Sequence, residues 1–311
     1  MDLAGREILV TGAGGFIGRV VVQTLLRCGV HVRALLGPED MVIAGDSNFE
    51  QLRADIRDVD SLRHAVRGVD SVIHLAGPAS VAESFKLPQE YAAVHVGGTA
   101  SILSQCDRAG VGRFIYISSA EVYGQPRSNP VREDDEQRSR SPYGAAKIGA
   151  EAFVAAFADA VRMEAVILRP FSVYGPGAST SSVIGTILRQ TEFESAVLMQ
   201  SLAPIRDYCF VGDVADAIVR ACYVAVPGRT VINLGSGVGT SVRELVRMIL
   251  ELKEISMPVV QAQQRERPRH TDIDCLVADV SRARKMLGWT AGTTLAQGLK
   301  QTLDATAYVV H

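Results

Sequence analysis

Short apolar runs alternate with longer amphipathic segments through the first half of the chain. The runs have the length and β-branched content of buried strands, and they stand at residues 8–10, 31–36, 51–56, 71–77, 114–118 and 165–169. Apolar residues at helical spacing fill the segments after Gly18, from 88 to 109 and from 143 to 161. This alternation predicts an α/β protein with a doubly wound parallel sheet and right-handed crossovers.

The pattern changes after residue 169. Gly175-Pro176-Gly177 opens a loop into a less regular region, and an apolar run at 231–235 predicts a returning strand. Ser241 is expected to cap a helix, and a last helix is expected to begin near Ser281. The polar stretch 125–141 is expected to be a solvated loop.

Composition narrows the classes of protein that this chain can represent. Of its 311 residues, 47% are hydrophobic and 21% are charged, which is an ordinary globular balance. A net charge of −2 gives no reason to expect nucleic acid or a membrane as a partner, and no apolar stretch reaches membrane-spanning length. Five scattered cysteines without metal-ligand spacing predict reduced thiols and no metal site. With no signal-peptide pattern near Met1, a cytoplasmic location is expected.

The first predicted strand leads directly into a glycine-rich turn. Gly12, Gly15 and Gly18 follow the apolar run 8–10, and a helix with an apolar stripe comes next. The glycines allow the main chain to approach a phosphate closely, and the amides at the helix N-terminus attract an anion. A glycine repeat between a strand and a helix is a dinucleotide-binding fingerprint.

This fingerprint sets the predicted division of the chain. Residues 1–169 are expected to form a Rossmann domain, with 207–235 returning to it. Residues 170–206 and 236–311 are expected to form a smaller α/β C-terminal substrate-binding lobe. No repeat or low-complexity linker separates the two parts, so the second is expected to build on the first.

The end of the second strand leaves the cofactor's phosphorylation state open. A carboxylate normally stands there and accepts hydrogen bonds from the adenosine ribose of NAD, but this chain has Leu36 and Gly37. Glu39 or Asp40 from the loop could replace it, Arg33 could favour a 2′-phosphate, or all three charges could simply be solvated. The predicted cofactor is NAD, with NADP not excluded.

A phenol and an ammonium group stand four residues apart on the helix that begins near residue 143. The spacing places Tyr143 and Lys147 on one helix face, where the positive charge is expected to lower the phenol's pKa for general-base chemistry. Ser119, just past the strand 114–118, can join the phenol in binding a substrate hydroxyl. His74, within an apolar strand, is interpreted as a hydrogen-bonded core residue.

With these motifs in place, the sequence resembles the extended short-chain dehydrogenase/reductase family, in its nucleotide-sugar epimerase/dehydratase branch. The resemblance covers nearly the whole chain, and it is carried by residues 11–18, 55–56, 74–77, 118–124, 141–147, 169–176, 205–208 and 279–283.

The resemblance implies an enzyme that binds NAD and a nucleotide-diphosphate sugar. It implies catalytic roles for Ser119, Tyr143 and Lys147. The cofactor-binding residues that it implies are Gly12, Gly15, Phe16, Ile17, Gly18, Asp55, Ile56, Leu75, Ala76, Gly77, Tyr143, Lys147 and Pro170. The substrate-binding residues that it implies are Ser119, Ser172, Arg206, Arg269 and Asp272.

The resemblance implies that the enzyme oxidises the sugar at C4. Several reactions of the resulting 4-keto sugar fit this resemblance. A 4-epimerase is the leading interpretation. Glu121 is typical of dehydratases and of decarboxylases that act on UDP-glucuronate, although it could also be a structural acceptor. Ala120 lacks the acid that 4,6-dehydratases usually place there. A non-catalytic NAD(P)-binding sensor is an alternative from another class, and the complete Ser119, Tyr143 and Lys147 set argues against it.

Other departures from the family pattern leave the base and the sugar open. His95 stands where an asparagine is usual, and Ser172 replaces another. Met199 and the run 200–202 replace an aromatic residue and a glycine-rich turn near the nucleotide base.

The helices at 88–109 and 143–161 are expected to form a four-helix homodimer interface. The second of them is apolar on more than one face, which is more apolar surface than one sheet face can cover.

Overall fold

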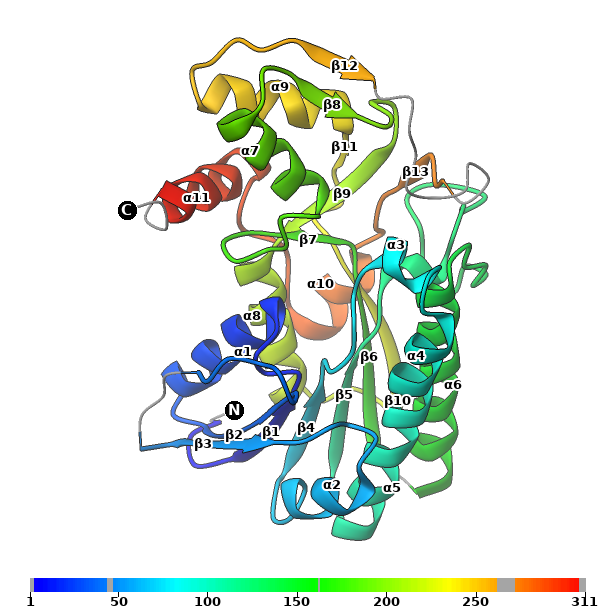
Figure 1. Cartoon of the computed structure of the whole chain (residues 1–311). Helices are drawn as coiled ribbons and strands as arrows, with labels where there is room; N and C mark the ends of the chain where they lie inside the picture. Colours follow the sequence, from blue (N-terminus) through cyan, green and yellow to red (C-terminus); the bar gives the residue numbers. More distant parts are fainter. Residues whose placement is uncertain (1–2, 44–46, 162, 262–271, 308–311) are drawn as a thin grey trace.

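A seven-stranded parallel sheet organises the larger part of the molecule (Figure 1). The computed structural model describes residues 3–43, 47–161, 163–261 and 272–307. The sheet has the order β10-β6-β5-β4-β1-β2-β3. Its strands are β1 (Glu7–Thr11), β2 (His31–Leu36), β3 (Phe49–Arg53), β4 (Ser71–His74), β5 (Arg113–Ile117), β6 (Glu164–Pro170) and β10 (Arg229–Leu234). The predicted doubly wound α/β fold is confirmed, and the order reverses between β1 and β4, where a crevice is expected.

Helices cover both faces of this sheet (Figure 1). One face carries α1 (Phe16–Arg27), α8 (Val211–Tyr223) and α10 (Ser281–Leu287). The other carries α2 (Val59–Ala65), α5 (Thr99–Ala109) and α6 (Pro142–Val161). Strands covered on both sides need apolar residues at successive positions, and Ile8, Leu9 and Val10 are accordingly buried. Two short helices, α3 (Val81–Ser84) and α4 (Pro88–Ala92), precede α5.

The predicted helix from 88 to 109 is helical throughout, but its geometry changes along its length. Between α4 and α5 lies a π-helical segment, η1 (Ala93–Gly98). The wider turn begins two residues before His95 and ends at Gly98, whose missing side chain leaves room for that of Ile56. Periodicity cannot reveal one extra residue in a helical turn, and such turns occur frequently at functional sites.

The smaller part of the molecule has its own sheet and its own core. The sheet contains β7 (Ser172–Tyr174), β9 (Ile205–Phe210), β11 (Gly239–Ser241) and β13 (Cys275–Leu276), and a separate pair joins β8 (Val197–Met199) to β12 (Val259–Gln261). Its helices are α7 (Val183–Phe193), α9 (Val242–Leu252) and α11 (Leu295–Ala307). Ser241 caps α9 as predicted, in a reciprocal capping box with Glu244.

The C-terminal part of the chain returns to the larger sheet. Ala283 and Leu287 of α10 and the nearby Trp289 are buried in the same core as α1 and α8. The indole Nε1 of Trp289 donates a hydrogen bond to the carbonyl oxygen of Asp213 at 3.0 Å. These contacts join residues from the range assigned above to the smaller lobe to the core of the larger sheet.

The stretch 125–141 differs from the solvated loop that its composition predicts. Val131 is fully buried and forms a β-bridge with Ala278, and the buried Glu133 accepts a hydrogen bond from the amide of Asn233 at 2.9 Å. These two residues find partners more than 90 positions away in the chain, so local composition could not predict their burial. The loop therefore ties the two parts of the molecule together.

The described residues contain no helix long and apolar enough to cross a membrane. They also contain no group of three or more His, Cys, Asp or Glu side chains arranged to hold a metal ion. The five cysteines are free thiols.

Candidate active site

The glycine turn between β1 and α1 is packed too closely for side chains. Gly12 has φ +67°, and a Cβ there would stand 2.7 Å from the amide nitrogen of Ala76 at the end of β4. A Cβ on Gly18 would collide with the carbonyl oxygen of Gly12. The first turn of α1 therefore lies directly on the turn, with its amides facing an open edge. Such a cradle fits the pyrophosphate of a dinucleotide.

A cavity of about 280 Å³, which we call the glycine crevice, extends from this turn across the ends of β1, β2, β3 and β4. It is lined by Gly12, Gly15, Leu35, Leu36, Gly37, Pro38, Asp40, Ala54, Asp55, Ile56, Leu75, Ala76, Gly77 and Val94. Seven of these are among the predicted cofactor-binding residues. Most of the lining is aliphatic or glycine, which fits a flat base placed between strand ends.

Two charged residues at or near the glycine crevice, Asp55 and Arg33, already have partners within the protein. Asp55 lines the cavity, but its carboxylate accepts three hydrogen bonds from Arg57, which hold its pKa below the usual range. Arg33 forms ion pairs with Glu7 and Glu50 and donates to two carbonyls near the end of α2. The alternative that Arg33 binds a 2′-phosphate is therefore not supported by its position.

His74 is the satisfied core residue that the sequence predicts. Its Nδ1 lies 2.7 Å from the hydroxyl of Thr11 and its Nε2 lies 3.0 Å from the hydroxyl of Thr99. Burial lowers its pKa to about 3, so the ring is neutral.

The three proposed catalytic side chains meet between β5 and α6. Ser119 lies two residues after the end of β5 and hydrogen-bonds to the phenol of Tyr143 in the first turn of α6. Lys147 lies one turn later, with its Nζ 5.9 Å from the centre of the Tyr143 ring. Gly144 brings the two elements together, because a Cβ there would stand only 2.6 Å from the carbonyl oxygen of Glu121.

Burial dominates the proton affinities in this group. It raises the pKa of Tyr143 to about 12, and Glu121 adds to this increase while the hydrogen bond from Ser119 opposes it. Burial lowers the pKa of Lys147 to about 7, with Glu151 opposing. The pKa of Tyr143 is therefore raised and not lowered as predicted, because desolvation outweighs the other influences on the phenol.

A buried ionic network lies behind the catalytic group, and the sequence reasoning missed it. Glu151 forms an ion pair with Arg169 of β6 at 2.7 Å and also accepts the hydroxyl of Ser118 at 2.5 Å. Arg169 donates in turn to the hydroxyl of Tyr123 at 2.8 Å. Lys147 itself donates to the carbonyl of Ile117 at 2.8 Å. The network fixes α6 against β5 and β6, and a carboxylate four residues after Lys147 in an apolar helix was the available signal.

His95 is a second buried group beside Tyr143. Its ring stands edge-on to that of Tyr143, with 5.6 Å between centres, and only 1% of its surface is exposed. Its Nε2 donates to the carbonyl of Pro78 at 2.9 Å, which leaves Nδ1 as an acceptor with no partner among the described residues. Burial and Lys147 lower its pKa to about 2, so a neutral imidazole replaces the usual asparagine.

The predicted substrate-binding residues come from the smaller sheet and the segment before β13. Ser172 of β7 lies opposite Tyr208 of β9, and Arg206 stands two residues earlier on β9. Arg206 is half-buried and donates to the carbonyl of Ile205 at 2.9 Å. The carbonyl of Asp272 accepts a hydrogen bond from Arg140 at 2.9 Å. Arg269 lies outside the described residues.

The remaining predicted residues extend this arrangement. Phe16 and Ile17 begin α1, and Pro170 ends β6 beside β10. Glu121 lies in a short 3₁₀ turn, η2 (Ala120–Val122), and its amide bonds to the hydroxyl of Ser119 at 3.2 Å. It is therefore close to both Ser119 and Tyr143.

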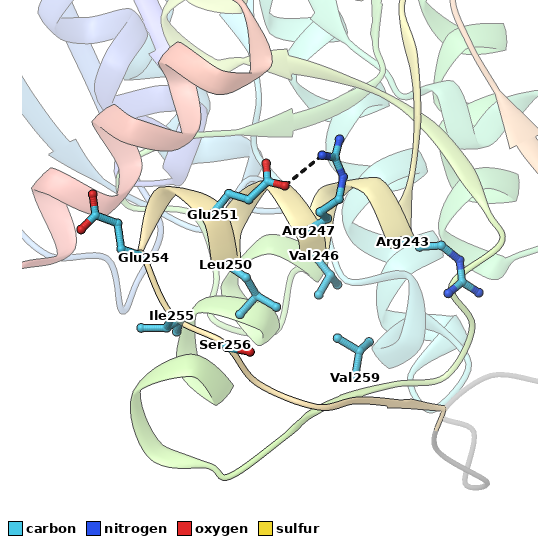
Figure 2. Close-up of a pocket in the computed structure, with 9 residues that line it drawn as sticks. All are labelled: Arg243, Val246, Arg247, Leu250, Glu251, Glu254, Ile255, Ser256 and Val259. Atoms are coloured by element: carbon cyan, nitrogen blue, oxygen red, sulfur yellow. Dashed lines mark hydrogen bonds and ion pairs between the residues drawn. The ribbon is translucent and has the colours of Figure 1, made fainter.

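A larger groove of about 530 Å³ lies elsewhere, along α9 (Figure 2). Val246, Leu250 and Val259 point toward one another, while Arg247 and Glu251 form an ion pair at 2.9 Å. None of the predicted catalytic, cofactor-binding or substrate-binding residues that the structure describes lines this groove. Its size alone does not make it the reactive site.

Comparison with known proteins agrees with this geometry. The family model described as GDP-mannose 4,6 dehydratase matches residues 9–302. The chain belongs to this family. Its members share the extended short-chain dehydrogenase/reductase pattern that the sequence motifs predict.

Two curated relatives are UDP-glucose 4-epimerases. The protein from Streptomyces lividans is 34% identical, over 91% of each chain. The protein from Mycolicibacterium smegmatis (strain ATCC 700084 / mc(2)155) is 33% identical, over 95% of this chain and 97% of the relative.

Solved structures of similar proteins share the fold. MoeE5 in complex with UDP-glucuronic acid and NAD has a TM-score of 0.89 at 31% identity, over 98% of this chain and 100% of its own. The UDP-glucose 4-epimerase of Thermotoga maritima with UDP-glucose has a TM-score of 0.90 at 28% identity, over the same shares. The NDP-hexosamine 5,6-dehydratase TunA has a TM-score of 0.87 at 28% identity, over 97% of this chain and 98% of its own. The family thus combines one fold with more than one reaction.

Proposed function

We propose that this protein is an NAD-dependent nucleotide-sugar 4-epimerase that acts on a UDP-hexose. The observation that carries the proposal is the meeting of Tyr143 and Lys147 of α6 with Ser119, which lies just past the carboxyl end of β5. The glycine crevice lies at the ends of β1 to β4 in the same parallel sheet. The epimerase reaction and the UDP group are supported by the names of the two curated relatives.

Tyr143 is proposed as the base that takes the proton from the sugar 4-hydroxyl. NAD, held by the residues of the glycine crevice, would supply a reversible acceptor for the hydride of the sugar C4. Ser119 already bonds to the phenol, so it can hold the same substrate oxygen in line. Ligand binding must lower the phenol's pKa from about 12.

Lys147 is proposed to assist that change. Its pKa of about 7 makes it a proton donor or acceptor near neutral pH, and its Nζ is anchored to the Ile117 carbonyl. When it is protonated beside the phenol, it stabilises the phenolate. Glu151 favours the charged form of Lys147 and so supports this role from behind.

The proposed substrate side consists of Ser172, Arg206, Arg269 and Asp272. The guanidinium groups suit a diphosphate, because arginine donates two hydrogen bonds in the geometry that phosphate oxygens accept. Asp272 suits the hydroxyls of a nucleotide ribose.

A dehydratase or a UDP-glucuronate decarboxylase is the second candidate, and the position of Glu121 favours it. This carboxylate raises the pKa of Tyr143, so it lies close enough to act on a substrate beside the phenol. A dehydratase needs such a base for the C5 proton. The 5,6-dehydratase among the structural neighbours supports this second candidate.

The test uses UDP-glucose, UDP-galactose, dTDP-glucose and UDP-glucuronate, with products read by NMR. UDP-glucose labelled with deuterium at C4 should yield UDP-galactose that retains the label, because the same hydride returns. Glu121→Gln should preserve this reaction in an epimerase and abolish turnover in a dehydratase. Release of CO₂ or a stable 4-keto-6-deoxy product would reject the epimerase. A Tyr143→Phe variant with an unchanged rate would reject the proposed base, and absence of all turnover in the intact protein would favour an NAD(P)-binding sensor.

We also propose a homodimer through α4, η1, α5 and α6, in a reducing compartment such as the cytoplasm. Val154 and Ala158 of α6 are covered within the chain, whereas Phe153 remains 40% exposed beside the exposed Ala152 and Ala156. The five free thiols suit a reducing compartment. Light scattering at micromolar concentration tests assembly, and a monomer near 33 kDa would reject the dimer.

A further inference from the structure

The turn that follows β2 is built to hold one carboxylate in the glycine crevice. Leu36 at the strand end is buried and carries no charge. The carboxylate of Asp40 accepts a hydrogen bond from the amide of Gly37 at 2.8 Å, which closes the turn on itself. Arg53 of β3 secures it from outside, donating to the carbonyls of Gly37, Pro38 and Asp40 at 2.6–2.8 Å.

This turn directs the Asp40 side chain against the glycine turn. A Cβ on Gly14 would stand 2.7 Å from both Cγ and Oδ2 of Asp40. Asp40 also lines the crevice together with Gly12 and Gly15. In contrast, Glu39 is exposed and does not line it. Of the two acidic residues that could replace the missing strand-end carboxylate, the geometry selects Asp40.

We propose that Asp40 binds the adenosine ribose of the cofactor and selects a free 2′-hydroxyl over a 2′-phosphate. The inference rests on the proposed function only in taking the ligand to be a nicotinamide dinucleotide. A carboxylate accepts hydrogen bonds from neutral hydroxyls, whereas a 2′-phosphate would bring a second negative charge against it. Asp40 provides this selection from the loop, because Leu36 at the end of β2 has no carboxylate.

Two cations lie beside the two turns that meet at Asp40, one at the glycine turn and one at the turn after β2, and they sharpen the inference. Arg19 of α1 donates from Nε to the carbonyl of Gly14 at 2.7 Å, and Arg53 makes the three carbonyl bonds described above. With the Asp40 carboxylate present, their positive charge is offset. In an Asp40→Asn variant the charges of these two guanidinium groups are no longer offset by Asp40, so they should attract a 2′-phosphate.

The experiment compares the affinities of NAD⁺ and NADP⁺ for the cofactor-depleted protein without any sugar. Asp40→Asn is the central variant, because its amide oxygen can still accept from Gly37 and preserve the turn. Glu39→Gln is the matched control, since it removes the same charge one residue earlier. Thermal melting of each variant verifies folding.

The wild-type protein should bind NAD⁺ about a hundredfold more tightly than NADP⁺, and Asp40→Asn should reduce that ratio at least about tenfold. The gain in NADP⁺ affinity should fall as salt is added, because it is electrostatic. Glu39→Gln should leave the ratio within about twofold. A wild-type preference for NADP⁺, an Asp40→Asn ratio within threefold of wild type, or an equal effect of Glu39→Gln would overturn the proposal. Because binding is measured without substrate, failure of the epimerase proposal leaves this result intact.

Discussion

The glycine crevice is formed largely by main-chain atoms, whereas the proposed substrate side is formed by side chains. In the crevice, main-chain atoms of Gly12, Gly18 and Ala76 lie so close together that a single added Cβ cannot fit at either glycine. On the substrate side, the assigned groups are side chains such as Ser172 and Arg206 on the strands of the smaller sheet. A site that is lined by main-chain atoms tolerates few substitutions at its glycines. A site that is lined by side chains can change its ligand specificity by substitution while the fold stays the same.

This difference agrees with where the sequence departs from the usual residues of the family. The glycine turn matches its fingerprint at every glycine, while His95, Ser172 and Met199 differ from the usual residues around the substrate. Ser172 and Met199 lie on short β-strands, and His95 lies in the π-helical segment η1. We therefore expect these differences to affect the choice of substrate more than the stability of the fold.

The largest effect is expected from Tyr143→Phe, which removes chemistry while leaving both regions in place. Turnover should fall about a thousandfold, because general acid–base groups contribute between about 10² and 10⁴. Affinity for NAD⁺ should change less than threefold. Steady-state rates and cofactor titrations measure the two quantities, and a parallel loss of both would mean that the phenol holds the cofactor site together.

Gly18→Ala should break the backbone-walled region alone. The new methyl group would collide with the Gly12 carbonyl, so the unfolding free energy should fall by about 2–3 kcal/mol and cofactor binding should be lost. Gly112→Ala is the matched control, since only the Asp70 carbonyl oxygen lies within 4 Å of its added Cβ, at 3.9 Å. Because Gly112 does not have a positive φ, alanine there should stabilise the protein by about 0.4–1 kcal/mol. Urea unfolding compares the two variants, and equal effects would contradict the distinction.

Arg206→Met should weaken the substrate side alone. We expect KM to rise about tenfold with kcat nearly unchanged, because a contact to the diphosphate is made equally in the ground and transition states. Arg243→Met, in the α9 groove, is the control and should leave KM unchanged. Titration with UDP gives the same comparison without turnover, and an unaltered UDP affinity in Arg206→Met would remove this residue from the site.

Lys147 is expected to contribute a pH-dependent part of the stability. Its folded pKa of about 7 lies below the ordinary lysine value of 10.5, so between these pH values the unfolded chain binds more protons. The unfolding free energy contributed by this group should therefore rise with pH across that window, by at most about 1.4 kcal/mol per pH unit. Lys147→Met should lack this increment in urea unfolding at pH 7.5, 8.5 and 9.5. Identical slopes for the two proteins would show that the ammonium group is not desolvated.

The sequence predicted the central sheet and the glycine turn because their signals are local. Strands buried on both faces require unbroken apolar runs, and a turn against a phosphate requires glycines at a fixed spacing. The spacing of Tyr143 and Lys147 on one helix face was likewise readable from helical geometry. These features depend on neighbours within a few residues, so the chain by itself determined them.

The tertiary structure decided the features that depend on distant partners. The π-turn at His95, the burial of Glu133 and the pairing of Glu151 with Arg169 each need a contact that sequence spacing does not encode. The same holds for the pKa of Tyr143, because burial raises it and only the packed chain defines burial. Asp40 and Glu39 are equivalent acids in the sequence, and only the turn clamped by Arg53 directs one of them into the crevice.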